Sequence, residues 1–184
     1  MQFTADGSVT RQGFHAGLSC GGGGGGGGCA VSDSYDAAVA SSNVAIDTNH
    51  AGHFGSGFRD YQGASDQYIT FVVPVAVFGD CQMQVGYALG ATDRPLRLEV
   101  NGMQTVLPGD GLLHFPPSSS WTDWRLTDPV TVALTAGSNT ITLRSVGSSG
   151  GNIDGIHIQC GGDGGAPAPA GEAAKSRHHN CRAL

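Results

Sequence analysis

The stretch from Trp121 to Cys160 decides the fold, and it reads WTDWRLTDPVTVALTAGSNTITLRSVGSSGGNIDGIHIQC. Apolar and polar residues alternate with a period of two in three parts of this stretch. Such alternation is typical of strands that bury one face, and it predicts strands at Trp124–Leu134, Asn139–Val146 and Ile153–Gln159. Two tryptophans precede one strand and an Asn-x-Asp sequence precedes another. This order can place a flat aromatic side chain and an asparagine amide at the same edge of a sandwich.

Further strands are predicted outside this stretch, at a spacing of about ten residues. They are Tyr35–Val39, Asn43–Ile46, Gln67–Val75, Cys81–Leu89, Pro95–Asn101 and Gln104–Leu107. Asn101-Gly102 predicts a type I′ hairpin between the last two. With about nine strands and no convincing helix, the predicted fold class is all-β, a β-sandwich jelly roll.

Charge and hydropathy limit the classes of partner. The 184 residues include 9 Lys and Arg against 15 Asp and Glu, which gives a net charge of −6. No basic cluster can follow a phosphate backbone, so we expect no nucleic acid partner. No apolar run approaches the roughly 18 residues of a membrane span. The polar N-terminus does not resemble a signal peptide, so we expect a fragment or a gene model that lacks its start.

The cysteines indicate an extracellular or cell-surface protein with disulfides rather than a zinc site. The five cysteines are Cys20, Cys29, Cys81, Cys160 and Cys181. No two of them are spaced C-x2-C, and the His-His-Asn-Cys sequence of the tail is isolated. Cys29 precedes the first strand and Cys160 follows the last, and these strands commonly neighbour each other in a jelly roll. We therefore expect a Cys29–Cys160 bridge. Cys81 has the alternative of being a small buried apolar residue.

The chain divides into four predicted parts. Residues 1–20 contain Phe3, Asp6 and Ser8, followed by Gly13-Phe14-His15-Ala16. This pattern resembles the C-terminal end of a CUB domain. Residues 21–28 are a glycine run that we expect to be a flexible linker. Residues 30–160 form the sandwich, and the Gly-, Ala- and Pro-rich residues 161–184 are expected to be a disordered tail or linker.

Six short motifs follow one another between residues 35 and 160. They are Tyr35-Asp36-Ala37-Ala38, Gly55-Ser56-Gly57-Phe58-Arg59-Asp60, Leu98-Glu99-Val100-Asn101-Gly102, Trp121-Thr122-Asp123-Trp124, Leu134-Thr135-Ala136-Gly137-Ser138-Asn139-Thr140-Ile141 and Asn152-Ile153-Asp154. In this order they resemble the motifs of carbohydrate-binding modules of the family 6 and family 35 group. The resemblance implies a galactose-binding-like jelly roll that binds glycans without catalysis, in loops at the edge of the sandwich. It does not decide between the two families.

The resemblance also implies the residues that would bind sugar. Asn152 matches the asparagine that bonds sugar hydroxyls, and Trp124 or Trp121 matches the stacking tryptophan. Phe58 matches the second aromatic, which is often a tyrosine in the group, and Tyr61 lies in the same loop. An aromatic face buries the apolar face of a pyranose, and an amide offers its hydroxyls both a donor and an acceptor.

Each of these residues also has a structural interpretation. Trp121 and Trp124 are three residues apart, so on a regular strand they would face opposite sides. We therefore expect one to contact sugar and the other to enter the core, and we favour Trp124 for the sugar. Asn152 has the alternative of capping a turn. Phe58 and Tyr61 have the alternative of covering the core.

The resemblance further implies a structural calcium near the first and last strands. Asp36 and Asp154 match two of its carboxylate ligands, whereas Ala38 stands where the group has a second glutamate. Because calcium takes six to eight oxygen ligands, the loss of one carboxylate leaves two alternatives, a site that still binds calcium and a site that has lost it. Asp154 has the alternative of being an ordinary turn residue. His50 and His53 are spaced H-x-x-H, but without a third ligand we predict no metal there.

Enzymatic activity is not predicted for this chain. A glycosidase needs two carboxylates across a cleft, and no such pair is recognisable. The nucleophile motif G-x-S-x-G is absent. The favoured function is therefore non-catalytic binding of a polysaccharide or glycoconjugate glycan, in an extracellular module that can accompany a glycan-active enzyme. The alternative is a structural or protein-interaction sandwich of an adhesion protein. An exposed aromatic beside Asn152 would distinguish the first from the second.

Overall fold

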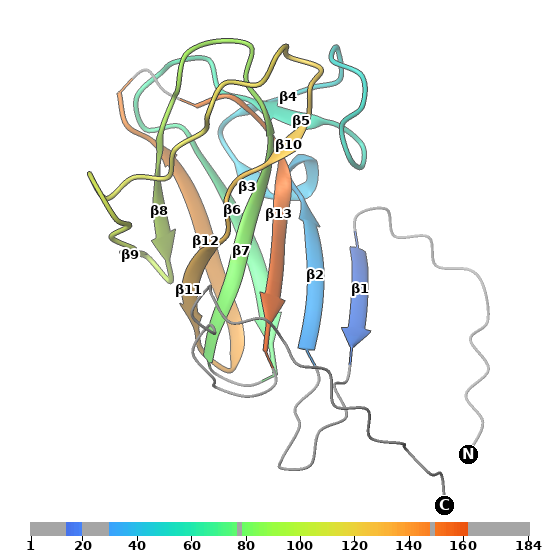
Figure 1. Ribbon diagram of the computed structural model, residues 1–184, viewed down its shortest axis with the longest axis vertical. Coiled ribbons are helices and arrows are strands. Elements are labelled where there is room, and N and C mark those ends of the chain that lie inside the picture. Colours follow the sequence, from blue (N-terminus) through green and yellow to red (C-terminus); the bar gives the residue numbers. More distant parts are fainter. Residues whose placement is uncertain (1–13, 20–29, 77–78, 148–149, 162–184) are drawn as a thin grey trace, which may run out of the picture.

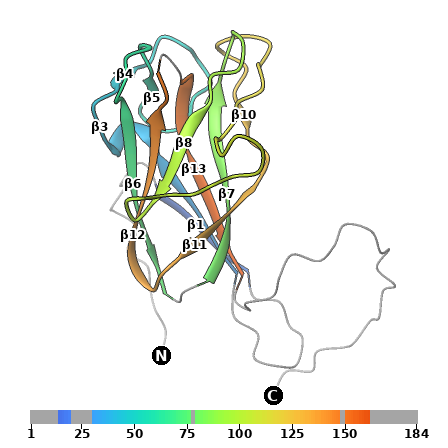
Figure 2. The same cartoon turned by 90° about the vertical axis from the view of Figure 1, so that its left-hand side faces the viewer.

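The alternating sequence folds into two sheets packed face to face (Figures 1 and 2). The computed structural model describes residues 14–19, 30–76, 79–147 and 150–161. Every strand pair in the described residues is antiparallel. The architecture confirms the predicted all-β sandwich.

The larger sheet has eight strands. They are β1 (Phe14–Ser19), β2 (Ala30–Asp36), β4 (Ala45–Asp47), β5 (Phe58–Asp60), β7 (Gly79–Ala88), β10 (Arg125–Leu126), β11 (Val130–Leu134) and β13 (Asn152–Cys160). β13 is the centre of this sheet, because it pairs with β7 on one side and with β2 and then β5 on the other.

The smaller sheet has five strands in the order β3-β6-β12-β8-β9. Their bounds are β3 (Ser41–Ser42), β6 (Tyr68–Val75), β8 (Leu96–Val100), β9 (Met103–Gln104) and β12 (Gly137–Ser145). One 3-10 turn, η1 (Ala37–Val39), is the only helical element of the described residues. No helix in that part of the chain is long or apolar enough to cross a bilayer.

The core lies between the sheets and follows the predicted alternation. On β6, Ile69, Phe71 and Val73 are buried, whereas Val72 and Pro74 between them are exposed. Core residues two apart also recur on β7 (Met83, Val85 and Tyr87), β12 (Ile141 and Leu143) and β13 (Ile156 and Ile158), although β13 is buried on both faces over its first five residues. Each fully buried side chain of this size contributes about 1.5–3 kcal/mol of transfer free energy. The hydrophobic contacts between the two sheets therefore stabilise the sandwich.

Two predicted strands are interrupted for local reasons. The predicted strand Trp124–Leu134 is divided into β10 and β11. Between them, the Thr127 hydroxyl accepts the Val85 N–H at 3.0 Å, and Pro129 has no N–H with which to continue the ladder. The predicted strand Tyr35–Val39 ends at Asp36, because the Asp36 carboxylate accepts the Ala38 N–H at 2.7 Å and starts η1.

The β8–β9 hairpin agrees with the sequence prediction. Asn101 has φ 51° and Gly102 has φ 79°. Both residues of a type I′ turn need positive φ, and Asn and Gly adopt it at the lowest cost.

The predicted Cys29–Cys160 disulfide is wrong. Cys160 is bonded to Cys81, and the two residues are cross-strand partners on β13 and β7. The first strand of the sandwich does neighbour the last, since β2 pairs with β13. However, β13 has a neighbour on each side, and at its end the residue on the β2 side is Val31 rather than a cysteine. Cys29 lies outside the described residues.

The predicted N-terminal part is described only from Phe14 to Ser19. These residues form β1, which pairs with β2 at one edge of the larger sheet. The other residues of the CUB-like part, the glycine run and the tail from residue 162 lie outside the described residues. The predicted domain boundaries therefore stay a prediction.

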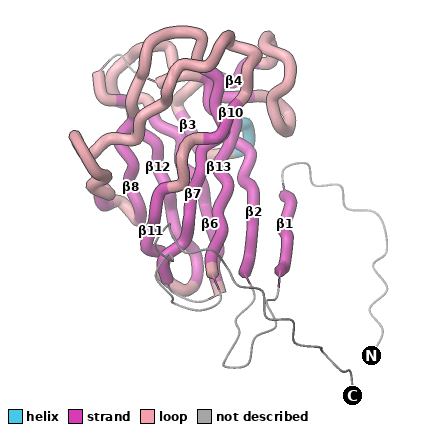
Figure 3. The backbone as a smooth tube through the Cα atoms, in the orientation of Figure 1, coloured by secondary structure: helices cyan, strands magenta, loops and turns pink. Residues whose placement is uncertain are grey.

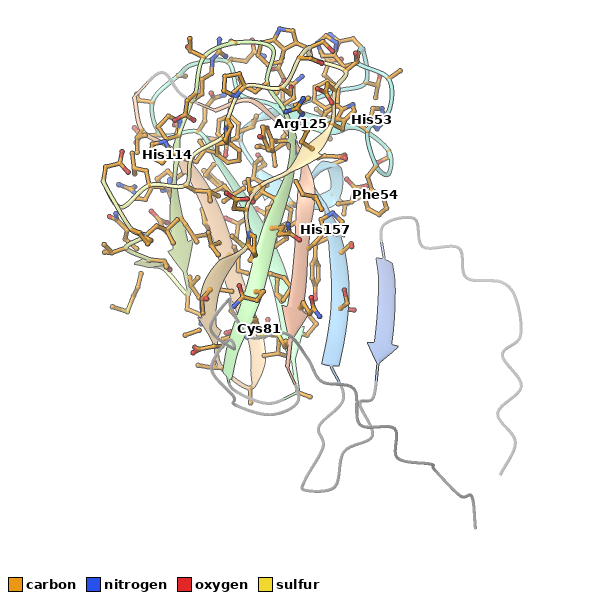
Figure 4. The ribbon with its side chains drawn as sticks, viewed as in Figure 1. His53, Phe54, Cys81, His114, Arg125 and His157 are labelled. Atoms are coloured by element: carbon orange, nitrogen blue, oxygen red, sulfur yellow. A yellow bond between two sulfur atoms is a disulfide. The ribbon has the colours of Figure 1, made fainter. Side chains whose placement is uncertain are left out.

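Long loops gather at one end of the sandwich (Figure 3). We call this set the apical loops, and they comprise residues 48–57, 61–67, 89–95, 116–124, 146–147 and 150–151. β13 begins among them at Asn152 and ends at Cys160, near the opposite end. Figure 4 shows His53 and His114 toward the apical end and Cys81 toward the other. The apical end thus collects the polar and aromatic residues that connect the strands.

Candidate functional site

The apical loops enclose a cleft of about 530 Å³. Its lining residues come from five segments that are distant in sequence. They are His50, Asp60, Tyr61, Gln62, Gly63, Arg94, Trp121 and Asn152. Three of the five predicted sugar-binding residues, Tyr61, Trp121 and Asn152, are therefore brought together in one cleft.

Asn152 is positioned by the central strand. It is the first residue of β13, and it pairs with Asp60 of β5 and Ala88 of β7. The side chain is only 2% exposed. Within the described part of the chain, no other group forms a hydrogen bond with its amide. An amide held at the wall of a cleft and free of protein partners there is available to a ligand.

Trp121 forms an aromatic wall of the cleft. It is half-buried and packs against the core. A Cβ atom on Gly90 would lie 2.7 Å from the indole Cδ1, so the glycine allows the backbone to lie against the ring. The His50 ring is nearly parallel to the indole, with 6.3 Å between centroids. The Arg94 guanidinium lies 5.5 Å from the centre of the indole. Three neighbours thus fix the orientation of Trp121.

Tyr61 is buried at the base of the cleft. Its hydroxyl donates to the Leu143 carbonyl at 2.8 Å, and burial raises the pKa of this hydroxyl far above its usual range. A Cβ atom on Gly150 would lie 2.4 Å from the Tyr61 ring, so this loop also packs directly on an aromatic face. The Tyr61 hydroxyl is therefore bonded away from the cleft, which Tyr61 lines as a buried residue.

Phe58 and Trp124 pack beside the cleft and do not line it. Phe58 has no exposed surface, and its ring lies 5.2 Å from that of Trp124. The Trp124 indole N–H donates to the Ala51 carbonyl at 3.0 Å. His50 and His53 each lie 5.8 Å from Phe58, so the two histidines belong to the same aromatic cluster. This cluster supports the 48–57 loop.

The sequence did not single out four residues of the cleft as ligand-binding groups. They are His50, Asp60, Gln62 and Arg94. Asp60 belongs to one of the quoted motifs, which could have identified it. His50 was considered only as a metal ligand with His53. Arg94 is an isolated cation in a loop, and nothing in its neighbouring residues indicates that it reaches Trp121.

The two predicted calcium ligands are buried close together. Asp36 is 2% and Asp154 is 8% exposed. Both Asp154 oxygens accept the Phe54 N–H, at 2.8 and 2.9 Å, and Asp36 accepts from Ala38 and Ser56 at 2.7 and 3.3 Å. Burial raises the pKa of Asp154 to about 6, and the charge of Asp36 adds to this rise against the opposing Phe54 hydrogen bond.

These residues do not by themselves fit a calcium ion. Calcium takes six to eight oxygen ligands, and Ala38 supplies no carboxylate. The described residues contain no group of three or more His, Cys, Asp or Glu side chains that could hold a metal, at the H-x-x-H loop or elsewhere. The two carboxylates already accept backbone N–H groups. Calcium binding at Asp36 and Asp154 therefore stays a prediction, and no step of the proposed function depends on it.

The chain is similar in sequence to parts of much longer glycan-active enzymes. It is 32% identical over 128 residues to a cycloisomaltooligosaccharide glucanotransferase of Niallia circulans, a match that covers 69% of this chain and 13% of that protein. It is 34% identical over 116 residues to an exo-beta-D-glucosaminidase of Amycolatopsis orientalis, with 62% of this chain and 11% of that protein covered. The chain thus spans only about an eighth of the length of the first of these relatives. No family model matches it.

Several of the solved structures that the chain resembles are single modules, which it covers almost completely. A family 35 carbohydrate-binding module from Clostridium thermocellum is 28% identical with a TM-score of 0.63, over 69% of this chain and 96% of that one. A family 35 module from an environmental isolate is 29% identical with a TM-score of 0.61, over 73% and 96%. The chain is a structural match for the family 35 carbohydrate-binding modules. The predicted recognition is confirmed for the sandwich, on the family 35 side of the group, and the CUB-like part is not shown.

The family 35 match also bears on catalysis. The matched structures are carbohydrate-binding modules, which confirms the prediction of a non-catalytic module. One further match, Xyl-CBM35, was solved in complex with a disaccharide that contains glucuronic acid; it is 26% identical with a TM-score of 0.60, over 72% of this chain and 99% of that one. Carbohydrate binding is thus the function by which these matched modules are named.

Proposed function

We propose that the apical cleft binds a glycan, with Trp121 as the stacking surface and Asn152 as the hydrogen-bonding amide. The observation that supports this most is that a half-exposed tryptophan and an unpartnered amide line the same cleft. A volume of about 530 Å³ is in the range of small-ligand sites. Arg94 and Asp60 add a charged donor and a charged acceptor to its walls.

The chemistry of a sugar suits these groups. The apolar face of a pyranose packs against an indole, and its equatorial hydroxyls accept and donate at the rim. Each hydrogen bond contributes about 0.5–1.5 kcal/mol net, so one site should bind with roughly micromolar to millimolar affinity. Phe58 and Trp124 act from behind the cleft by holding the 48–57 loop. Tyr61 contributes its ring from the base.

Location outside the cell is part of the proposal. The Cys81–Cys160 disulfide supports it, since disulfides persist mainly in oxidising compartments. The relatives are glycan-active enzymes by name, which supports a role as an accessory module beside a catalytic domain.

A panel of polysaccharides tests the proposal on the full chain. Affinity electrophoresis or calorimetry would compare the wild type with Trp121→Ala and Asn152→Ala. We expect both variants to stay folded and to lose at least about tenfold in affinity, although Trp121→Ala also removes packing against the core and should lower the melting temperature. Thr131→Ala, an exposed change on β11 away from the cleft, is the matched control and should bind normally.

Two results would contradict the proposal. Undiminished binding by both variants would place the site elsewhere on the sandwich. If the wild type bound no glycan of a broad panel, a structural or protein-interaction sandwich would be the better account of the fold.

A further inference from the structure

Arg59 is a buried cation in the middle of β5. Only 9% of the residue is exposed. Its guanidinium donates to four backbone carbonyls, and in each case the distance is 2.8 or 2.9 Å. The acceptors are the carbonyls of Ala37, Ala38, Ala40 and Val44. One side chain thus binds four carbonyls of the segment that leads from η1 to β4.

This arrangement has a clear electrostatic logic. Carbonyl oxygens that converge on one point repel one another unless a cation lies between them. A guanidinium offers five N–H donors in a rigid plane, so it can serve four acceptors at once. Burial lowers the pKa of Arg59, and the charge of Asp36 opposes that lowering. No salt bridge joins Arg59 to a carboxylate among the described residues, so carbonyls are its main partners.

The same part of the fold is where the family resemblance implies a structural calcium. Here the carboxylate expected at position 38 is missing, and the carbonyls of Ala37, Ala38, Ala40 and Val44 already accept hydrogen bonds from Arg59. We propose that Arg59 is the resident cation of this region. The guanidinium, covalently part of the chain, does the work of a bound divalent ion, and the fold does not depend on metal.

Arg59 also links this region to the cleft. Its neighbours on β5 are Phe58, the centre of the aromatic cluster, and Asp60, which lines the cleft. In the sheet, Arg59 pairs with Ile153, directly after Asn152. Loss of the guanidinium should therefore loosen both the η1 region and the strand that carries the base of the cleft.

Thermal unfolding of the full chain tests the proposal. The wild type would be melted with excess calcium and with a chelator, together with Arg59→Lys and Arg59→Met. Arg97→Met is the matched control, because Arg97 is more exposed and pairs with Glu99 on the surface. We expect the wild-type Tm to differ by less than about 2 °C between calcium and chelator. Arg59→Met should lower Tm by about 8 °C more than the control does, and Arg59→Lys should fall between them.

Two outcomes would overturn the proposal. One is a wild-type Tm that falls by about 2 °C or more in chelator and returns with calcium. The other is an Arg59→Met variant that melts like the Arg97→Met control. If Arg59→Met does not fold, the proposal is tested on the wild type alone, by the comparison of its Tm in calcium and in chelator and by its metal content after purification. Stoichiometric bound calcium would contradict the proposal, and its absence after dialysis against calcium would support it.

Discussion

Cys81 and Cys160 face each other across β7 and β13, with their Cα atoms 4.2 Å apart and their sulfurs bonded. The bond closes a loop between residues 79 positions apart in the sequence. It fastens the central strand of the larger sheet at the end away from the cleft.

Removal of this disulfide should destabilise the fold without changing the cleft. A loop of this length contributes about 2–4 kcal/mol through the lost entropy of the unfolded chain. We expect a Cys81→Ala/Cys160→Ala variant to lose about that much free energy of unfolding, measured by urea denaturation, and to keep its glycan affinity. Peptide mapping of the oxidised wild type should recover a Cys81–Cys160 peptide. A Cys29–Cys160 peptide would contradict the structure.

Gly90→Ala should impair the cleft through Trp121. The added Cβ would lie 2.7 Å from the indole Cδ1 and 2.8 Å from its Nε1, so the ring must move. If Trp121 is the stacking surface, affinity should fall by at least about tenfold, or about 1.4 kcal/mol. Gly79→Ala, where a Cβ would meet nothing within 4 Å, is the matched control. Equal affinity of the two variants would show that the position of Trp121 is not critical.

Asn139 should be among the polar residues that matter most for stability. Its fully buried amide accepts from Thr135 and Asn101 and donates to the Thr135 carbonyl. Asn139→Ala would leave several buried groups without partners, at a cost of about 3 kcal/mol in free energy of unfolding. Thr140→Ala, the exposed neighbour, should cost far less. A urea midpoint equal to that of this control would contradict the expectation.

His114 should make stability depend on pH. Its two ring nitrogens contact Asp93 and Asp110, and the hydrogen bond to Asp93, followed by that to Asp110, raises the pKa of His114. Because the folded-state pKa exceeds the unfolded one, the stabilisation is complete at low pH and is lost as pH rises through the folded-state value. His114→Gln should thus lower Tm by about 2 °C near pH 5.5 and by less near pH 9. A Tm difference that is constant with pH would contradict this.

The sheets could be predicted from sequence because each strand carries its own alternation. β6 shows Ile69, Phe71 and Val73 inward whatever lies beside it. The disulfide could not be predicted in this way, because the alternation on β13 does not show which of the two neighbouring strands carries the partner of Cys160. The prediction for Trp121 and Trp124 assumed that both lie on a regular strand, which they do not. Both precede β10 in a turn, where a spacing of three residues fixes no face.

The cleft was predicted in part. Asn152 and Trp121 carry motif signals that are local in sequence, and Tyr61 directly follows a motif. His50 and Arg94 reach the same place only because two loops fold over the indole, and that contact has no signature in either loop. Phe58 matched a sugar-contacting position, yet it has no exposed surface and packs against His50, His53 and Trp124. Side-chain exposure in loops depends on packing that one sequence does not display.

The direction of β13 has a consequence for how such a module is attached. The strand starts at the cleft with Asn152 and, after nine residues, ends at Cys160 beside the start of β2. At about 3.3 Å per residue, the exit of the sandwich lies roughly 26–30 Å from the cleft. A domain fused after Cys160 would therefore join the base of the sandwich. The cleft would face away from such a neighbour. The module could then bind a polysaccharide chain while the tethered enzyme acts on another part of the same chain.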